Sequence, residues 1–355
     1  MTFAIPLLFL LPAASLHAAA PKPQPSAQEQ ALTAPIRGLN EKRLILPGIK
    51  AAANEYVSYA IYYWPDPAKP GGPYRVIDGK KNAELMESGD LQRLADMLRN
   101  VRILGDAYAK THDKRYAVRA GQWLRHWFVN PKTKMQPHLA YSQIRPGHET
   151  SGLGGGIIDM ANLPDTLRAI SRLRRSPALT QKEWTAVDAW LRDYGRWLAD
   201  SPAGQHERKT SNNHFLYYMA QRAAIASYLG DTASARTCLE EARSRMGDHI
   251  AQDGSQPHET KRAKGGSYSI YALKAWFLLA ELGEKNGVDY WNYHAPNGAS
   301  LAKAYAFLHA MAQEEKRNSP ANSPQISDSS LKTMGRTISS KLAPNSPDRT
   351  LLPAT

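Results

Sequence analysis

Residues 91–109 read LQRLADMLRNVRILGDAYA, and the spacing of their apolar side chains is that of a helix. Apolar residues recur three and four positions apart, which is the period that places side chains on one face of an α-helix. They are Leu91, Leu94, Leu98, Val101 and Tyr108. Alternation with a period of two, typical of a half-buried strand, is scarce elsewhere in the chain. The stretch therefore predicts an amphipathic helix in a helical protein.

The same spacing recurs along the chain. Tyr116, Trp123 and Trp127 share one helical face, and Val187, Trp190 and Tyr194 share another. Further helices are expected at 157–174, 212–229, 232–250, 267–286 and 299–315. Short turns separate helices of similar length, which is typical of antiparallel helical hairpins. We expect an all-α fold, an (α/α) toroid or incomplete barrel of antiparallel helical hairpins.

Three long segments interrupt the helical pattern, at 59–82, 135–160 and 253–269. They are rich in aromatic residues, Pro and Gly, and long irregular loops in a compact domain are usually functional or disordered. Their Trp, Tyr and His content favours function, so we expect them to line a groove at one end of the helices. The glycines at 152–156 do not form a phosphate-binding loop, because no strand precedes them and no Lys-Ser/Thr follows.

The composition limits the kinds of binding partner that suit the chain and indicates how it is organised. The formal charge of +13 over 355 residues indicates an anionic partner. Scattered basic residues and the lack of a nucleic-acid-binding motif exclude nucleic acid. The single cysteine, Cys238, excludes an intrachain disulfide and any multi-cysteine metal site, and no metal or other cofactor is expected. The expected organisation is a signal peptide (1–20), a linker (21–35), a catalytic domain (36–316) and a disordered tail (317–355).

The first twenty residues, MTFAIPLLFLLPAASLHAAA, are apolar and end in small residues. The run is too short and too interrupted by proline to span a membrane, so it is read as a cleaved signal peptide. We expect a periplasmic or secreted protein that is not inserted in the membrane and is a monomer.

Two polar segments hold the candidate catalytic residues: Asn213 and His214 in TSNNH, and Arg262 and Tyr268 in HETKRAKGGSY. A helix cap explains one asparagine of the first segment but not the pair with a histidine. Together the four side chains suit β-elimination from a uronic acid. Amide and guanidinium groups can stabilise the charge that builds on the carboxylate as the adjacent proton leaves, while His and Tyr transfer protons.

A second set of residues is expected to bind the sugar. Aromatic faces can stack on pyranose rings, and polar side chains of the loops can bond to sugar hydroxyls. The set comprises Tyr63, Trp64, His138, Tyr141, Gln143, His258 and Glu259. For the aromatic residues, anchoring of the loop is an equal alternative, and an ion pair between Glu259 and Arg262 is an alternative for that pair.

The chain resembles the alginate lyase family. The resemblance runs from about Tyr59 to Tyr293 and rests on YYWPDPAKPGGPY, QPHLAYSQIRPG, GGGIIDM, SNNHFLYY, QDGSQPHETKR, GSYSIYAL and GVDYWNY. It implies an (α/α) toroid in which Asn213 and Arg262 neutralise the substrate carboxylate. It also implies that Tyr268 is the acid and that His214, or Tyr268 itself, is the base. The chain departs from the family pattern at Gly265 and Gly266 and after about Ala310.

The expected function is therefore a polysaccharide lyase that cleaves an anionic polyuronate of the alginate or glucuronan type. One alternative is a glycoside hydrolase on a similar helical toroid, which needs two carboxylates about 5–10 Å apart. Asp159, Asp165, Asp253 and Glu259 are the available acids. The other alternative is a non-catalytic polyuronate-binding protein.

Overall fold

The computed structural model describes residues 25–352, apart from 40–45, 47, 149–150, 153 and 319–325. The predicted signal peptide lies outside these residues. Within them, no helix has the length and apolar character that crossing a membrane requires.

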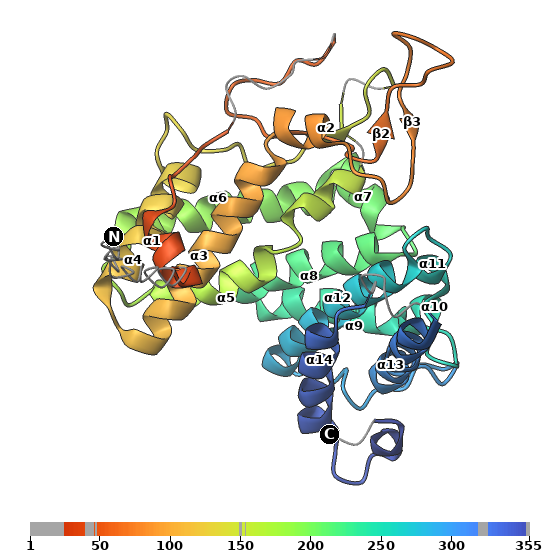
Figure 1. Cartoon of the computed structure of the whole chain (residues 1–355). Coiled ribbons are helices and arrows are strands. Elements are labelled where there is room, and N and C mark those ends of the chain that lie inside the picture. Colours follow the sequence, from red (N-terminus) through yellow and green to blue (C-terminus); the bar gives the residue numbers. More distant parts are fainter. Residues whose placement is uncertain are drawn as a thin grey trace, which may run out of the picture.

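Helices form nearly all of the regular structure (Figure 1). The α-helices are α1 (Ala27–Thr33), α2 (Ala83–Ser88), α3 (Leu91–Thr111), α4 (Lys114–Leu124), α5 (Leu163–Leu173), α6 (Gln181–Asp200), α7 (Pro202–Arg208), α8 (Asn213–Tyr228), α9 (Thr232–Ser244), α10 (Met246–His249), α11 (Pro257–Thr260), α12 (Gly265–Asn286), α13 (Leu301–Asn318) and α14 (Asp328–Lys341). Shorter turns of other helix types are η1 (Arg125–Val129), η2 (Gly154–Met160) and η3 (Pro347–Leu351).

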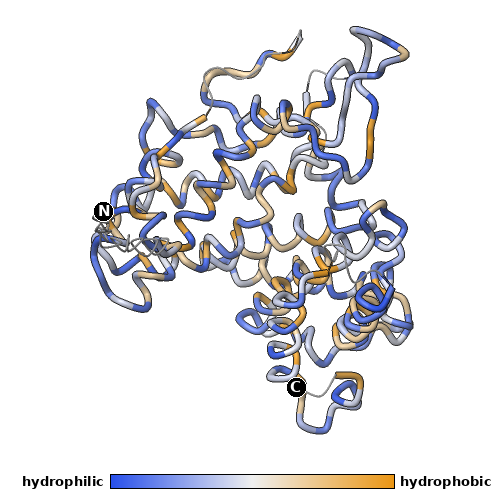
Figure 2. Tube along the Cα trace, in the orientation of Figure 1, coloured by the Kyte–Doolittle hydropathy of each residue, from blue (hydrophilic) through white to orange (hydrophobic). Residues whose placement is uncertain are grey.

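Helix α8 is the centre of the array, since it packs against α5, α6, α9 and α12. Its buried residues lie all round the helix, including Phe215, Leu216, Tyr217 and Tyr218. A helix that is apolar on every side is stable only when neighbours enclose it. The outer helices are amphipathic instead, and Figure 2 shows apolar and polar residues alternating along them.

Local signals explain where the helices begin and end. Thr180 and Glu183 form a capping box at the start of α6, and Asp113 and Asp231 cap α4 and α9. The helix expected at 157–174 is divided into η2 and α5. Pro164 stands in the first turn of α5, where its missing N–H costs nothing, so it starts a new helix rather than continuing the old one.

Four short strands bring distant loops together: β1 (Val57–Tyr59), β2 (Tyr63–Trp64), β3 (Arg75–Val76) and β4 (Tyr141–Ile144). β1 pairs with β4 in parallel, and β2 pairs with β3 as an antiparallel hairpin. The loops at 59–82 and 135–160 are therefore joined by backbone hydrogen bonds. The register of β1 and β4 shifts between the two strands' ends, and Gln143 takes the left-handed conformation there, with φ of 48°.

The linker predicted at 21–35 is wrong for the part that forms α1. Ser26 and Glu29 make a capping box, in which each side chain bonds to the other residue's backbone N–H. Ala31 is buried, and α1 packs against α3 and α4. Composition suggested a linker because of the prolines, but no proline stands between Pro25 and Pro35, and the good helix formers AQEQAL lie between them.

The disordered tail predicted at 317–355 is wrong for residues 326–352. α14 packs against α13, with Leu331, Met334 and Ile338 buried in the seam. These apolar residues recur at helical spacing, but the many Ser, Asn and Pro residues around them concealed the pattern. Asp348 then accepts a hydrogen bond from Ser300 at 2.6 Å, which fastens the end of the chain to the loop before α13.

Removal of the residues after Asn318 should therefore lower the melting temperature by about 5 °C or more, because a buried seam would be exposed to water.

Ile338→Ala should cost about 2–5 kcal/mol of unfolding free energy, whereas Thr333→Ala on the exposed face of the same helix should cost almost nothing. Thermal and urea unfolding followed by circular dichroism measures both. Equal stability of the full and shortened chains would show that α14 does not dock in solution.

Candidate active site

The candidate catalytic residues lie where the beginnings of α8 and α12 meet the end of α7 and the short helix α11. Figure 1 places α7 and α11 at the same side of the helical array, with the β2–β3 hairpin above them. α11 packs against α12, and α7 packs against α8 and η2. Segments far apart in the sequence thus supply the residues of one site.

The two asparagines of TSNNH have different partners. Asn212 is the helix cap, since its Oδ1 accepts a hydrogen bond from the backbone N–H of His214 at 3.1 Å. Asn213 donates its backbone N–H to Oε1 of Glu259 at 2.6 Å and its side-chain Nδ2 to Oε2 at 2.8 Å. The capping interpretation therefore accounts for Asn212 and leaves Asn213 for another purpose.

Glu259 lies beneath Asn213 and is 2% exposed. Burial raises the pKa of this carboxyl, while the two hydrogen bonds from Asn213 act against that rise. Because Asn213 donates to both carboxylate oxygens, Glu259 orients the asparagine and is not a sugar-binding residue. The alternative ion pair between Glu259 and Arg262 does not form, because Arg262 bonds to another acid.

His214 pairs with Glu207 at the end of α7. Its Nδ1 lies 2.9 Å from Oε2 of Glu207, which is 1% exposed, whereas 24% of the His214 side chain is exposed. A carboxylate oxygen accepts a hydrogen bond, so Nδ1 is the donor, and Nε2 of a neutral ring in this tautomer keeps its lone pair. Gly155 adjoins the ring, since a Cβ at Gly155 would lie 3.5 Å from Cε1 of His214.

Arg262 is held by Asp78, which follows the β2–β3 hairpin. Its Nη2 donates to Oδ1 of Asp78 at 2.7 Å and its Nε donates to Oδ2 at 3.1 Å. The guanidinium holds the pKa of Asp78 at about 2, well below the ordinary value. The same guanidinium lies 4.0 Å above the ring of Tyr268. Asp78 thus fixes the plane of Arg262 over the tyrosine.

Tyr268 stands in the first turn of α12, and its hydroxyl donates to Oδ1 of Asp78 at 3.3 Å. Burial raises the pKa of Tyr268 above its ordinary value, and the neighbouring Tyr62 adds to the rise. The phenol therefore carries its proton at neutral pH. Gly265 explains the departure from the family pattern, because a Cβ there would overlap the carbonyl oxygen of Thr260 in α11.

These contacts form two groups, one around His214 and Asn213 and the other around Arg262 and Tyr268. They adjoin at Glu259, whose pKa responds to the charges of both Arg262 and His214. The structure therefore brings together the four residues that the sequence singled out. Asn213 and His214 begin α8, while Arg262 and Tyr268 flank the beginning of α12.

The other predicted sugar-binding residues are spread over the surrounding loops. Trp64 donates its indole N–H to the carbonyl of Lys80 at 2.9 Å, and the Lys80 ammonium lies 4.5 Å above its ring. Tyr63 meets the ring of His148 edge-on at 5.7 Å. Both contacts anchor the hairpin, while the two aromatic side chains stay partly exposed.

The remaining predicted residues differ in their surroundings. His138 pairs with Glu55 at 3.1 Å, and Tyr141 packs beside the small apolar cluster of Val57 and Ile144. Gln143 donates its amide to Asp159 at 2.8 Å. His258 is exposed on α11, next to the buried Glu259.

Sequence reasoning missed the acids that position the site. Asp78 sits in a turn, VIDGKK, and Glu207 in a polar helix end, HERKT, so neither carries a pattern of its own. Asp159 was considered only as a hydrolase acid, and it accepts hydrogen bonds from Tyr56 and Ser58. Among the described residues, no group of His, Cys, Asp or Glu side chains is arranged to hold a metal ion.

Comparison with known proteins agrees with this geometry. The family model described as alginate lyase matches residues 48–318. The crystal structure of an alginate lyase from Bacteroides ovatus superposes with a TM-score of 0.82 and 30% identity, covering 91% of this chain and 86% of that one. No curated protein matches.

More distant structures share the fold. A His-to-Ala variant of alginate lyase A1-III, complexed with a tetrasaccharide, has a TM-score of 0.58 and 16% identity, covering 95% of this chain and 88% of that one. Alginate lyase A1-III from Sphingomonas species A1 has a TM-score of 0.54 and 16% identity, covering 84% and 79%.

The predicted all-α toroid of helical hairpins is confirmed by these matches, and so is the resemblance on which the enzymatic expectation rested. The family model spans well over half of the chain. The chain belongs to the alginate lyase family and is a polysaccharide lyase.

Proposed function

We propose that this lyase cleaves a polyuronate of the alginate or glucuronan type by β-elimination at Asn213, His214, Arg262 and Tyr268. The observation that carries the proposal is the arrangement of His214 and Tyr268. The buried Glu207 bonds to Nδ1 of His214, which leaves Nε2 of the imidazole without a protein partner. Asp78, which is paired with Arg262, accepts a hydrogen bond from the phenol of Tyr268.

Neutralisation of the substrate carboxylate is assigned to Asn213 and Arg262. Asp78 occupies Nε and Nη2 of the guanidinium, so Nη1 can donate to a substrate carboxylate without releasing Asp78. Asn213 bonds to Glu259 through one amide hydrogen and keeps the other. Such preplaced donors stabilise the charge that develops when the proton at C5 leaves.

Proton transfer is assigned to the other pair. His214 takes the C5 proton at Nε2, the bond between C4 and the glycosidic oxygen breaks, and Tyr268 gives its proton to that oxygen. A double bond forms between C4 and C5, and exchange with water returns both side chains to their starting states. The phenol of Tyr268 carries its proton at neutral pH, as a general acid must. Each positioned group contributes on the order of 10²–10⁴ in rate.

The surroundings of the candidate hydrolase acids do not favour hydrolysis. Asp159 accepts bonds from Tyr56, Ser58 and Gln143, and Glu259 accepts two from Asn213. Asp165 pairs with Arg168, and Asp253 accepts the backbone N–H of Ser255. Each acid already has a structural partner, so none is presented as a free general acid.

For the whole chain we propose export to the periplasm or the medium after cleavage of residues 1–20, and action as a monomer. The apolar N-terminal run with its small-residue end supports export.

Tyr268→Phe should lower turnover of polyuronate by about 10²-fold or more, because the ring is kept and only the proton-carrying oxygen is lost. The rise in ultraviolet absorbance from the unsaturated product measures turnover. Tyr116→Phe on α4, remote from the site, is the matched control and should keep full activity. Turnover by the Tyr268→Phe variant equal to that of the parent would contradict the mechanism.

The neighbouring asparagines should behave oppositely in turnover. Asn212→Ala removes a cap and should cost about 0.5–2 kcal/mol of stability with little change in the activity of the folded enzyme. Asn213→Ala should cut turnover by about 10²–10³. It should also destabilise the fold, because the buried Glu259 loses the side-chain donor to Oε2 and keeps only the backbone N–H of residue 213. Comparable turnover in the two variants would contradict the assignment.

Asp78→Asn should lower kcat/KM for polyuronate by about 10- to 100-fold, because Arg262 loses the charge-assisted bonds that fix its plane. Glu87→Gln removes an exposed acid of the adjacent helix α2 and serves as the control. Initial rates over a range of substrate concentrations give the value. If Asp78→Asn matched Glu87→Gln, Asp78 would be a surface partner without influence on catalysis.

A further inference from the structure

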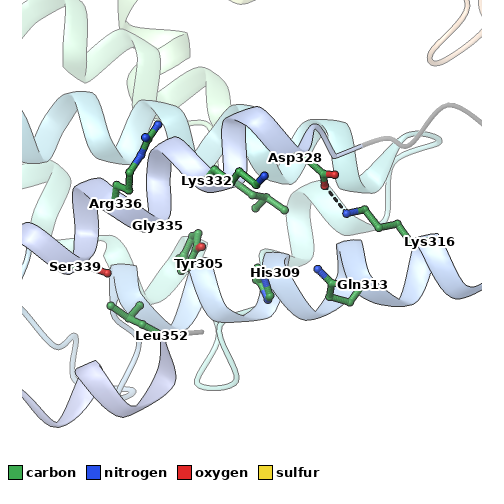
Figure 3. Close-up of a pocket in the computed structure, with 11 residues that line it drawn as sticks. Tyr305, His309, Gln313, Lys316, Asp328, Lys332, Gly335, Arg336, Ser339 and Leu352 are labelled. Atoms are coloured by element: carbon green, nitrogen blue, oxygen red, sulfur yellow. Dashed lines mark ion pairs between the residues drawn. The ribbon is translucent and has the colours of Figure 1, made fainter. Parts of the chain in front are cut away.

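A pocket of about 500 Å³ lies between α13 and α14, apart from the site described above (Figure 3). One wall is a row of side chains on a single face of α13: Tyr305, His309, Gln313 and Lys316. The other wall belongs to α14, and Leu352 closes one end. No lining residue is shared with the candidate active site. Pockets of this size commonly hold small ligands.

The lining carries an excess of positive charge. Its cations are Lys316, Lys332 and Arg336, and its only carboxylate, Asp328, is paired with Lys316 at 2.6 Å. Lys332 and Arg336 stand one turn apart on α14 and make no ion pair with another described residue. Like charges at this spacing repel each other on a helix, so an anion between them relieves the repulsion.

The floor of the pocket contains a polar group without a protein partner. Tyr305 is 3% exposed, and its hydroxyl makes no hydrogen bond to any described residue. Gly335 faces it, and a Cβ at that position would overlap the hydroxyl oxygen. The hydroxyl oxygen itself is not fully buried, so it opens into the pocket. The hydroxyl is therefore available to a ligand, and the absence of a side chain at position 335 keeps it so.

The remaining lining defines the chemistry of that ligand. Leu331 and Leu352 offer apolar contact, while Gln313 and Ser339 offer hydrogen bonds. A sugar ring with a carboxylate, several hydroxyls and an apolar face matches the positive charge, the hydrogen-bonding side chains and the apolar side chains of the lining. These are the features of a uronate unit in a polysaccharide.

We propose that the pocket between α13 and α14 is a second, non-catalytic binding site for a uronate unit of the polymer. The inference rests on the proposed polyuronate substrate. α14 lies beyond residues 48–318, which the family model matches. A polymer bound there keeps its other segments near the active site at a raised effective concentration.

Lys332→Ala/Arg336→Ala tests the proposal. Lys110→Ala/Lys114→Ala is the matched control, since it removes the same charge from exposed positions on α3 and α4. The pocket variant should keep the kcat of the parent within about twofold, since neither residue touches the active site. Its KM for long polyuronate should rise at least about fivefold, while its KM for an alginate tetrasaccharide stays near the parent value. The control should change neither KM.

Direct binding separates this inference from the proposed function. Titration calorimetry with an alginate tetrasaccharide, in the Tyr268→Phe background, should show two sites per chain, and one after the pocket substitutions. Tyr305→Phe, which keeps the packing, should weaken the same site. If site number and polymer KM match those of the Lys110/Lys114 control, the pocket is not a uronate site. If the parent chain, with Tyr268 intact, makes no unsaturated product from polyuronate, the proposed elimination is wrong; loss of one tetrasaccharide site on the pocket substitutions would still support uronate binding in the pocket.

Discussion

The carboxylate of Glu259 lies where water scarcely reaches, and its two hydrogen bonds from Asn213 are the interaction on which the site depends. A buried charge costs several kcal/mol unless its oxygens are satisfied, so the start of α8 must stay beside α11. That fixes Asn213, and with it His214 as the next residue. Glu207 then orients the imidazole from α7, and the enclosing helices keep α8 from shifting.

Sequence periodicity predicted the helices well because burial on one face leaves a trace within a single segment. α3, α6 and α12 were each foreseen from apolar residues at three- and four-residue spacing. α1 and α14 were missed, although α14 has the same spacing at Leu331, Met334 and Ile338. The Ser, Asn and Pro content of the tail is typical of disorder, although its apolar residues recur with a helical period. Composition reports an average, whereas burial depends on position.

The candidate site divides in a similar way. Asn213, His214, Arg262 and Tyr268 could be predicted because each side chain has a distinct chemical task. Asp78 and Glu207 could not, because an acid that pairs with a distant cation looks like any other surface acid in the sequence. Aromatic residues posed another difficulty. From the sequence alone, the Trp64 ring could either stack on a sugar or anchor the hairpin. Its hydrogen bond to the Lys80 carbonyl shows that it anchors the loop.

Asp78 and Arg262 are 184 residues apart in the chain, yet they share two hydrogen bonds. Chains emerge from the ribosome amino end first, and helices such as α3, α4 and α5 have their partners close by in sequence. Asp78, which aligns the guanidinium, is therefore synthesised well before Arg262, its partner. The active site is complete only when the carboxyl-terminal half has docked. A chain interrupted before that half is made can therefore form helices of the amino-terminal half but lacks Arg262 and Tyr268.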